Sequence, residues 1–96
     1  MILGSCRSTI QDTDHSSIIG GFCNNIYHTG CYSTIIGGKY NINSCAYAVV
    51  SGTGITTDRD CSTFVNNLSI KNIPTASTGL PSGSVWSNSG VLNIVP

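Results

Sequence analysis

The most reactive side chains in this sequence are five cysteines and two histidines. Cys31, Cys45 and Cys61 are spaced almost evenly, and His15 precedes Cys31 by a similar interval. Thiolates and an imidazole could bind Zn²⁺ if they converged as a tetrahedron, but zinc sites usually include a close C-x-x-C pair, which this chain lacks. We therefore predict a column of small, buried or half-buried thiols on successive turns of a repeating backbone, with no metal. Disulfides between neighbouring turns are the alternative.

Nucleophilic chemistry is the other use for such residues. Cys31 could pair with His15 or His28, but no third orienting residue or oxyanion-binding corner accompanies either pair. The glycine pairs are not followed by a helix or by Lys-Ser/Thr, so they do not predict a phosphate cradle. Asp58, Arg59 and Asp60 indicate a solvated turn with too few oxygen ligands for Ca²⁺. We expect no enzyme activity, no catalytic residue and no cofactor.

Composition narrows the class of protein further. Charged residues are 8% of the 96 residues and the net charge is zero, whereas average globular proteins have about 25% charged residues. This balance predicts no nucleic-acid partner. No apolar run approaches the roughly 20 residues of a membrane span, so we expect no membrane insertion. Abundant Gly, Ser, Thr and Asn with recurring Ile and Val favour strands and turns, and hence an all-β protein.

An internal repeat explains the glycine pairs. Apolar pairs recur at similar intervals along the chain, at Ile2-Leu3, Ile18-Ile19, Ile35-Ile36, Val49-Val50 and Phe64-Val65. Each pair is followed by a dipeptide of small or turn-forming residues, and a second apolar position comes later, at Ile10, Ile26, Ile42, Ile55 and Ile70. Gly and Asn enter left-handed backbone regions most cheaply, so the dipeptides predict sharp corners. The corner residues are expected to be Gly20, Gly21, Gly37, Gly38, Gly52, Asn66 and Asn67.

Each repeat thus predicts a strand, a corner, a second short strand and a return turn. Repeats of about 14–17 residues with two strands are typical of a parallel β-solenoid or β-roll, here of about five coils. Adjacent strand residues point to opposite faces, so only one member of each apolar pair can face the interior. The other members form an outward column, for which the candidates are Ile19, Ile36, Val50 and Val65 or the residues immediately before them. Such a stripe would be exposed on a monomer, so the sequence predicts a homo-oligomer.

The segments "SSIIGGFCNNI" and "YSTIIGGKYNI" resemble the head repeats of trimeric autotransporter (YadA-like) adhesins, which also occur in phage and viral tail fibres. The resemblance covers roughly residues 1–73. It implies left-handed parallel β-rolls and three chains packed around one axis. This chain differs from the family in having no recognisable coiled-coil stalk or membrane anchor, which favours the fibre version. The resemblance also implies partners among other fibre or virion proteins.

The periodicity ends at Pro74, so we divide the chain into residues 1–73, the β-roll repeats, and residues 74–96, a connector with a C-terminal β-hairpin. Segments Ser84-Val85-Trp86 and 91–95 flank the turn "SNSG", which is typical of a hairpin. Because open solenoid ends aggregate, we expect this hairpin to cap the last coil. Trp86 is a further candidate for an interface residue, against the last coil or another chain, and a less favoured candidate for contact with a receptor or glycan.

The functional expectation is therefore a structural and attachment protein, a homotrimeric segment of a viral or phage fibre on a virion or extracellular surface. Identical turn surfaces on three chains would bind a host receptor or glycan through avidity. The alternatives are a bacterial trimeric adhesin head and an ice- or surface-binding β-solenoid. The column Ser16, Ser33, Tyr47 and Ser62 argues against the latter, because Tyr47 would interrupt a flat hydroxyl array.

Overall fold

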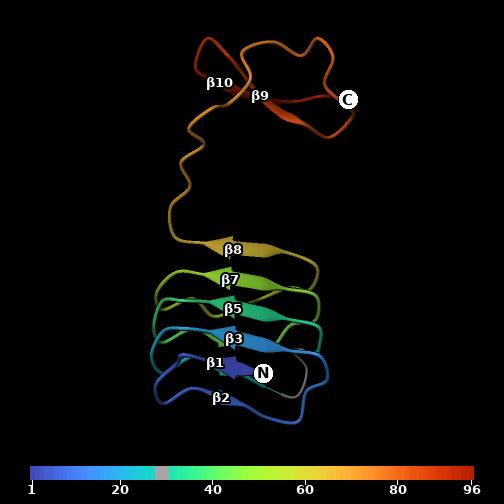
Figure 1. Ribbon diagram of the computed structural model, residues 1–96. Helices are drawn as coiled ribbons and strands as arrows, with labels where there is room; N and C mark the ends of the chain where they lie inside the picture. Colours follow the sequence, from blue (N-terminus) through green and yellow to red (C-terminus); the bar gives the residue numbers. More distant parts are fainter. Residues whose placement is uncertain (28–30) are drawn as a thin grey trace.

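A computed structural model describes residues 1–27 and 31–96, and its described residues form strands and turns without a helix. Figure 1 shows a stack of coils with a hairpin beyond its last strand. The strands of the stack are β1 (Ile2–Leu3), β2 (Thr9–Ile10), β3 (Ser17–Ile19), β4 (Asn25–Ile26), β5 (Thr34–Ile36), β6 (Ile42–Asn43), β7 (Val49–Ser51) and β8 (Thr63–Val65). The hairpin consists of β9 (Val85–Asn88) and β10 (Val91–Ile94).

Two parallel sheets build the stack, which confirms the predicted β-solenoid. One sheet has the order β1-β3-β5-β7-β8 and the other the order β2-β4-β6. A further column of parallel bridges joins Cys6, Phe22, Lys39 and Thr53. Because five strands of one sheet are separated by four intervals, the solenoid has about four turns, slightly fewer than the five coils expected.

The register of the fourth coil differs from the sequence alignment by one residue. Ile35 pairs with Val50, not with Val49, and Val50 pairs in turn with Phe64. The corner after β7 is one residue shorter than the corner after β5. Thr53 and Lys39 are bridged to each other, but Thr53 follows the inward Val50 by one residue fewer than Lys39 follows the inward Ile35. A shift of one residue moves every side chain to the other face of a strand. Val50 is therefore 0% exposed, and its assignment to the outward column was wrong.

The core is a narrow row of aliphatic side chains between the two sheets. Ile18, Ile35 and Val50 from the first sheet and Ile26 from the second are completely buried, and Ile10, Ile55 and Phe64 pack against them. Ile42 was expected to continue the second apolar position after Ile10 and Ile26. Instead Ile42 pairs with Asn25, and Asn43 takes the position in line with Ile26. Asn43 is fully buried and donates from Nδ2 to the carbonyl of Ala48 at 3.4 Å.

The glycine pair at each corner meets two separate demands. Gly37 has φ +66° and open space where a Cβ would lie, so only its backbone conformation favours glycine. Gly38 has φ +75°, and a Cβ there would overlap the backbone carbonyl of Gly52 in the next coil. Gly20 and Gly21 repeat the pattern, while Gly52, Asn66 and Asn67 lie outside the positive-φ region. The glycine corners therefore permit neighbouring coils to approach closely.

Two asparagines beneath this corner form a buried ladder. Asn41 donates from its backbone N and from Nδ2 to Oδ1 of Asn24, at 3.1 and 3.0 Å. Its Nδ2 also donates to the Gly52 carbonyl at 2.7 Å, and its Oδ1 accepts from Ile55 N at 3.0 Å. The ladder satisfies backbone groups that the corner leaves without strand partners. Asn66 plays a similar role at the next corner. Its Oδ1 accepts from the Thr53 N–H and its Nδ2 donates to the Thr53 carbonyl.

The C-terminal segment forms the predicted hairpin. β9 and β10 are antiparallel, with Trp86 opposite Asn93, and the turn residues Ser89 and Gly90 both have positive φ. Positive φ at both turn positions is typical of a type I′ turn, which suits the twist of two strands. In Figure 1 the hairpin lies beyond β8 at the end of an extended connector, and it is not seen to cover β8. The expected cap is therefore not shown.

Candidate assembly face

The outer face of the five-stranded sheet carries a column of exposed aliphatic side chains. Leu3 is 58%, Ile19 41%, Ile36 48% and Val65 42% exposed. Parallel pairing places them in one column, in which Ser51 occupies the position that the sequence alignment gave to Val50. We call this column, Leu3, Ile19, Ile36, Ser51 and Val65, the outward column.

A second column lies beside it on the same face. Ser17, Thr34, Val49 and Thr63 are paired in register and are half-buried or exposed. These residues are β-branched or small, so the face combines methyl groups and hydroxyls on a regular backbone lattice. Tyr47 does not interrupt it, because Tyr47 precedes β7 and lies in a different column. Tyr47 is therefore absent from the array, but Val49 interrupts its hydroxyls, and Ser16 and Ser33 of the expected hydroxyl column are buried.

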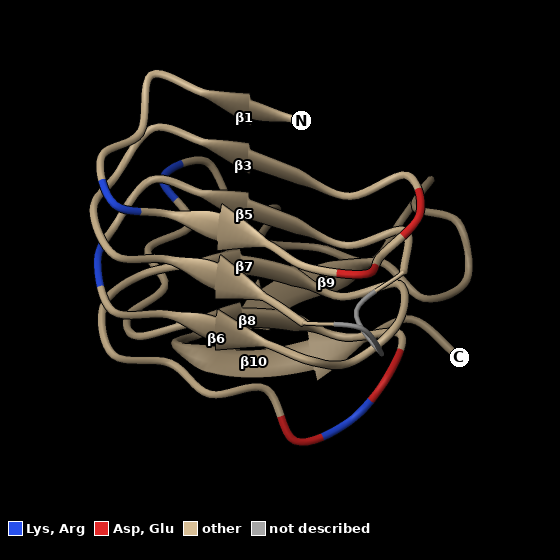
Figure 2. Ribbon diagram, turned by 90° about the horizontal axis from the view of Figure 1, so that it is seen from below, with Lys and Arg blue, Asp and Glu red and all other residues tan. Residues whose placement is uncertain are grey.

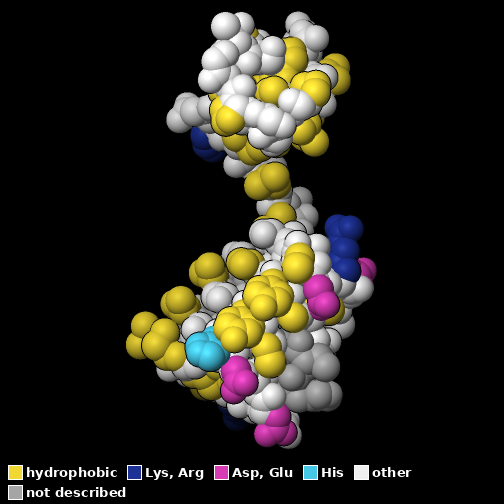
Figure 3. All heavy atoms as spheres, turned by 90° about the vertical axis from the view of Figure 1, so that its right-hand side faces the viewer, with side chains coloured by type: hydrophobic (Ala, Val, Ile, Leu, Met, Phe, Trp, Pro, Cys, Tyr) yellow, Lys and Arg dark blue, Asp and Glu magenta, His cyan; other side chains and the backbone are white. Residues whose placement is uncertain are grey.

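An aromatic ladder follows one edge of this face. His15 and Tyr32 have ring centroids 4.9 Å apart, and Tyr32 and Tyr47 have centroids 5.2 Å apart, with planes within 3° of parallel. Figure 3 shows the His ring in line with the hydrophobic side chains of this edge. The ladder residues occupy the left-handed region, with φ between 54° and 58°, as does Cys61 in the following coil. The sequence signal for the ladder was the nearly equal spacing of its members, which matches the length of one coil.

The ladder shows that the three cysteines do not share a column. Tyr47 N donates to the Cys31 carbonyl and Cys61 N donates to the Ala46 carbonyl, which aligns Cys31 with Ala46 and Cys61 with Tyr47. Cys45 directly precedes Ala46, so the three thiols occupy three neighbouring columns. The predicted thiol column was wrong, because the coils differ in length.

No group of three or more His, Cys, Asp or Glu among the described residues could hold a metal ion. His28 lies outside the described residues. No pocket opens in the described part of the chain, so the candidate sites are surfaces.

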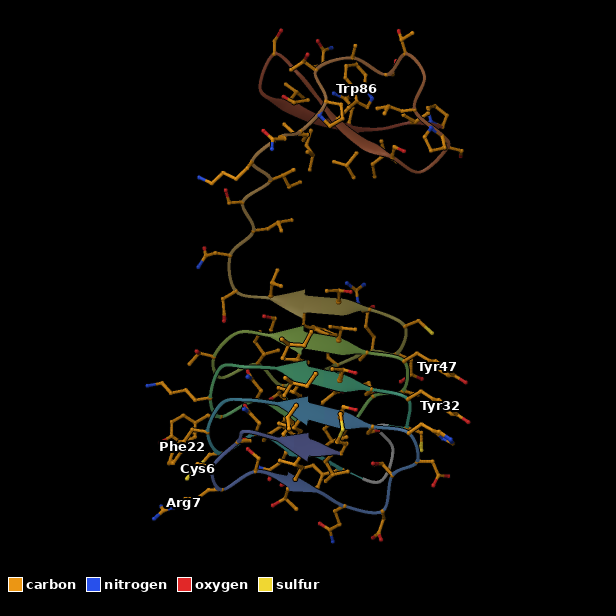
Figure 4. All side chains as sticks on the ribbon, in the orientation of Figure 1. Cys6, Arg7, Phe22, Tyr32, Tyr47 and Trp86 are labelled. Carbon is orange, nitrogen blue, oxygen red and sulfur yellow. The ribbon has the colours of Figure 1, made fainter. Side chains whose placement is uncertain are left out.

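The opposite edge of the face combines cations with aromatic rings. The Arg7 guanidinium lies 5.9 Å from the Phe22 ring centroid, and the Lys39 ammonium lies 6.0 Å from that of Tyr40. Phe22 and Tyr40 meet edge to face with centroids 5.9 Å apart. Figure 4 places Arg7 and Phe22 at the edge opposite Tyr32 and Tyr47.

The remaining predicted interface residue, Trp86, is half-buried within the distant hairpin segment (Figure 4). Four aliphatic side chains of the hairpin, Val85, Val91, Leu92 and Ile94, are exposed. Hydrophobic side chains therefore reach solvent both on the outward column and on the hairpin.

Comparisons with known proteins identify no relative of this chain. No family model matches the chain, and neither a curated protein nor a solved structure matches it. No helix in the described residues is long and apolar enough to cross a membrane.

Proposed function

We propose that this chain is a structural protein whose copies associate through the outward column, as a homotrimeric β-roll segment of a viral or phage fibre. The observation that carries the proposal is the exposure of Leu3, Ile19, Ile36 and Val65 in one column on a regular sheet. Fully burying an exposed aliphatic side chain contributes roughly 1.5–3 kcal/mol. These four side chains are already about half buried, so each would contribute roughly half of that, and the four from each chain together would still drive association.

The resemblance of the repeats to YadA-like heads and tail-fibre repeats supports three chains around one axis and a left-handed coil. It also supports a virion or extracellular surface as the location, a setting that a bacterial trimeric adhesin head would share. Host attachment would use the turn surfaces, because three identical copies add weak contacts to a receptor or glycan. The exposed hairpin would meet the hairpins of neighbouring chains through Trp86 and its apolar strands, in place of capping β8.

Sedimentation equilibrium of the purified chain tests the association. A trimer has three times the 10.0 kDa mass of one chain. The measured mass should stay at the trimer value over a wide range of protein concentration, while circular dichroism shows β structure. A well-folded monomer would rule the proposal out.

A second candidate function is binding to a crystalline surface such as ice. The observation that favours it is the pair of parallel columns on one face, in which Ser17, Thr34, Val49 and Thr63 lie beside the outward column. The two candidates exclude each other for this face, because a trimer would cover it. A monomer that lowers the freezing point without lowering the melting point of ice would establish the second candidate.

A further inference from the structure

The two edges of the sheet face carry opposite charge. The basic edge consists of Arg7 and Lys39 with Phe22 and Tyr40. Lys39 and Phe22 lie in one column of parallel bridges, and Arg7 follows Cys6 of that column. In Figure 2 basic segments lie on one side of the coil stack, and the acidic segments, with a basic segment between two of them, lie on the other side.

The acidic edge consists of Asp12, Asp14, Asp58 and Asp60. Backbone hydrogen bonds run along this edge from Tyr32 N to the Asp14 carbonyl, from Tyr47 N to the Cys31 carbonyl and from Cys61 N to the Ala46 carbonyl. In each bond the residue before the donor is in line with the acceptor residue. Asp14 therefore belongs to the column that continues through Cys31 and Ala46 to Asp60. The Asp60 carboxylate accepts from Ala46 N at 2.9 Å, which holds it at the turn. Arg59 stands between two of these acids, so the edge keeps a net negative charge.

The strands of the sheet run from the acidic edge to the basic edge. Asp14 precedes β3 and Phe22 follows it, and the same order repeats in the next coil from Cys31 through β5 to Lys39. The outward column therefore lies between a negative and a positive edge. The charged residues of both edges are exposed, and Asp60 alone among them also bonds to the backbone through its carboxylate.

The opposite charges of the two edges constrain the way in which copies of the chain can pack. If outward columns meet around a common axis with all stacks pointing the same way, the basic edge of each chain approaches the acidic edge of the next. If one stack is inverted, like edges meet and the charges repel. We infer that a second copy of this chain docks its acidic edge, Asp12, Asp14, Asp58 and Asp60, on the basic edge of its neighbour, so that association is directional and parallel.

This inference rests on the proposed self-association and adds the residues that set its direction. Exposed ion pairs are individually weak, so the apolar column supplies most of the affinity and the charges select the orientation. Because solvent-exposed charges are screened by salt, the contribution should decrease as ionic strength rises.

A charge-exchange series in the full chain tests the pairing. The first variant carries Arg7→Glu and Lys39→Glu, the second carries Asp14→Lys and Asp58→Lys, and the third combines all four substitutions. Asp60 is left unchanged because of its bond to Ala46 N. Lys71→Glu is the control, since it makes the same charge change in the connector, outside the coil stack.

We expect the first and second variants each to raise the concentration for half-dissociation by about tenfold at low salt, and less at high salt. The third variant should recover part of the lost association, because the basic edge becomes negative while the acidic edge, in which Asp12, Arg59 and Asp60 are unchanged, becomes weakly positive. The control should remain native. Circular dichroism checks that each variant is folded.

The pairing is overturned if the wild-type chain assembles but the two double variants assemble as well as it does, or if the combined variant fails to recover while still folded. Failure of the wild-type chain to assemble would instead refute the proposed function itself. The two outcomes are therefore distinguishable.

Discussion

Tyr32 and Tyr47 lie in adjacent coils with ring centroids 5.2 Å apart and ring planes inclined by only 3°. Both residues have positive φ, at 58° and 54°, a conformation that is unfavourable for bulky side chains. The stacking of one ring on the next offsets part of this cost, because each coil places its turn residue directly over the preceding one. The same regularity aligns the outward column and the charged edges.

The first prediction concerns this ladder. Tyr47→Ala should lower the free energy of unfolding by about 1 kcal/mol, because an aromatic pair contributes roughly 0.5–1.5 kcal/mol beyond the area it buries. Tyr47→Phe keeps the ring and should leave stability unchanged. Urea unfolding followed by circular dichroism measures both variants, and equal losses for Ala and Phe would show that the hydroxyl matters more than the stack.

The second prediction separates the two glycines of one corner. Gly37→Ala should cost roughly 1–2 kcal/mol, because it places an L side chain at positive φ in open space. Gly38→Ala should cost considerably more, since its Cβ would overlap the Gly52 carbonyl. Gly37→Asn is the control, because Asn tolerates this conformation better than Ala. Thermal melts in which Gly38→Ala is no worse than Gly37→Ala would contradict the close approach of the coils.

The third prediction concerns the buried asparagine ladder. Asn41→Ala removes side-chain partners of the Gly52 carbonyl and of Ile55 N, and each buried unsatisfied group costs about 1–3 kcal/mol. We therefore expect a loss of several kcal/mol, which is large enough to unfold a small solenoid. Asn72→Ala, at an exposed position of the connector, is the matched control and should change stability by less than about 0.5 kcal/mol. Chemical denaturation of the two variants gives the comparison.

The fourth prediction tests the register of the fourth coil. Val50→Asp should unfold the chain as Ile35→Asp does, because each would bury an unpaired charge in the core. Ile36→Asp and Ser51→Asp lie on the outward column and should leave the monomer folded, with association lost most clearly for Ile36→Asp. Circular dichroism and sedimentation together distinguish unfolding from dissociation. A folded Val50→Asp chain would restore the alignment that the sequence favoured.

The fifth prediction concerns the thiols. Because Cys31, Cys45 and Cys61 lie in three neighbouring columns, changing all three to Ala should preserve the fold and the oligomeric mass. Metal analysis of the native protein should find no zinc in stoichiometric amount. Zinc bound by the native chain and lost from the triple variant would require a site that these columns do not form.

The local features of the fold could be predicted from the sequence. Corners at Gly20-Gly21 and Gly37-Gly38, strands at the apolar pairs and a hairpin around Ser89-Gly90 depend on the backbone preferences of a few adjacent residues. The spacing of the repeats adds the parallel solenoid, because one coil cannot bury its apolar residues without the next. These inferences hold whichever residue of a pair faces inward.

The position of each side chain in its column was decided only by the tertiary structure. Val49-Val50 looks like Ile35-Ile36 in the sequence, yet the fourth corner is one residue shorter and Val50 turns inward. The same variation in coil length separates Cys31, Cys45 and Cys61 and brings His15, Tyr32 and Tyr47 into one stack. Hydrogen bonds and packing between coils select the register, and a regular interval in the sequence cannot reveal where within a coil a residue has been gained or lost. The sequence by itself therefore determined the coil and its corners, whereas contacts between coils decided which residues form the core, the outward column and the two charged edges.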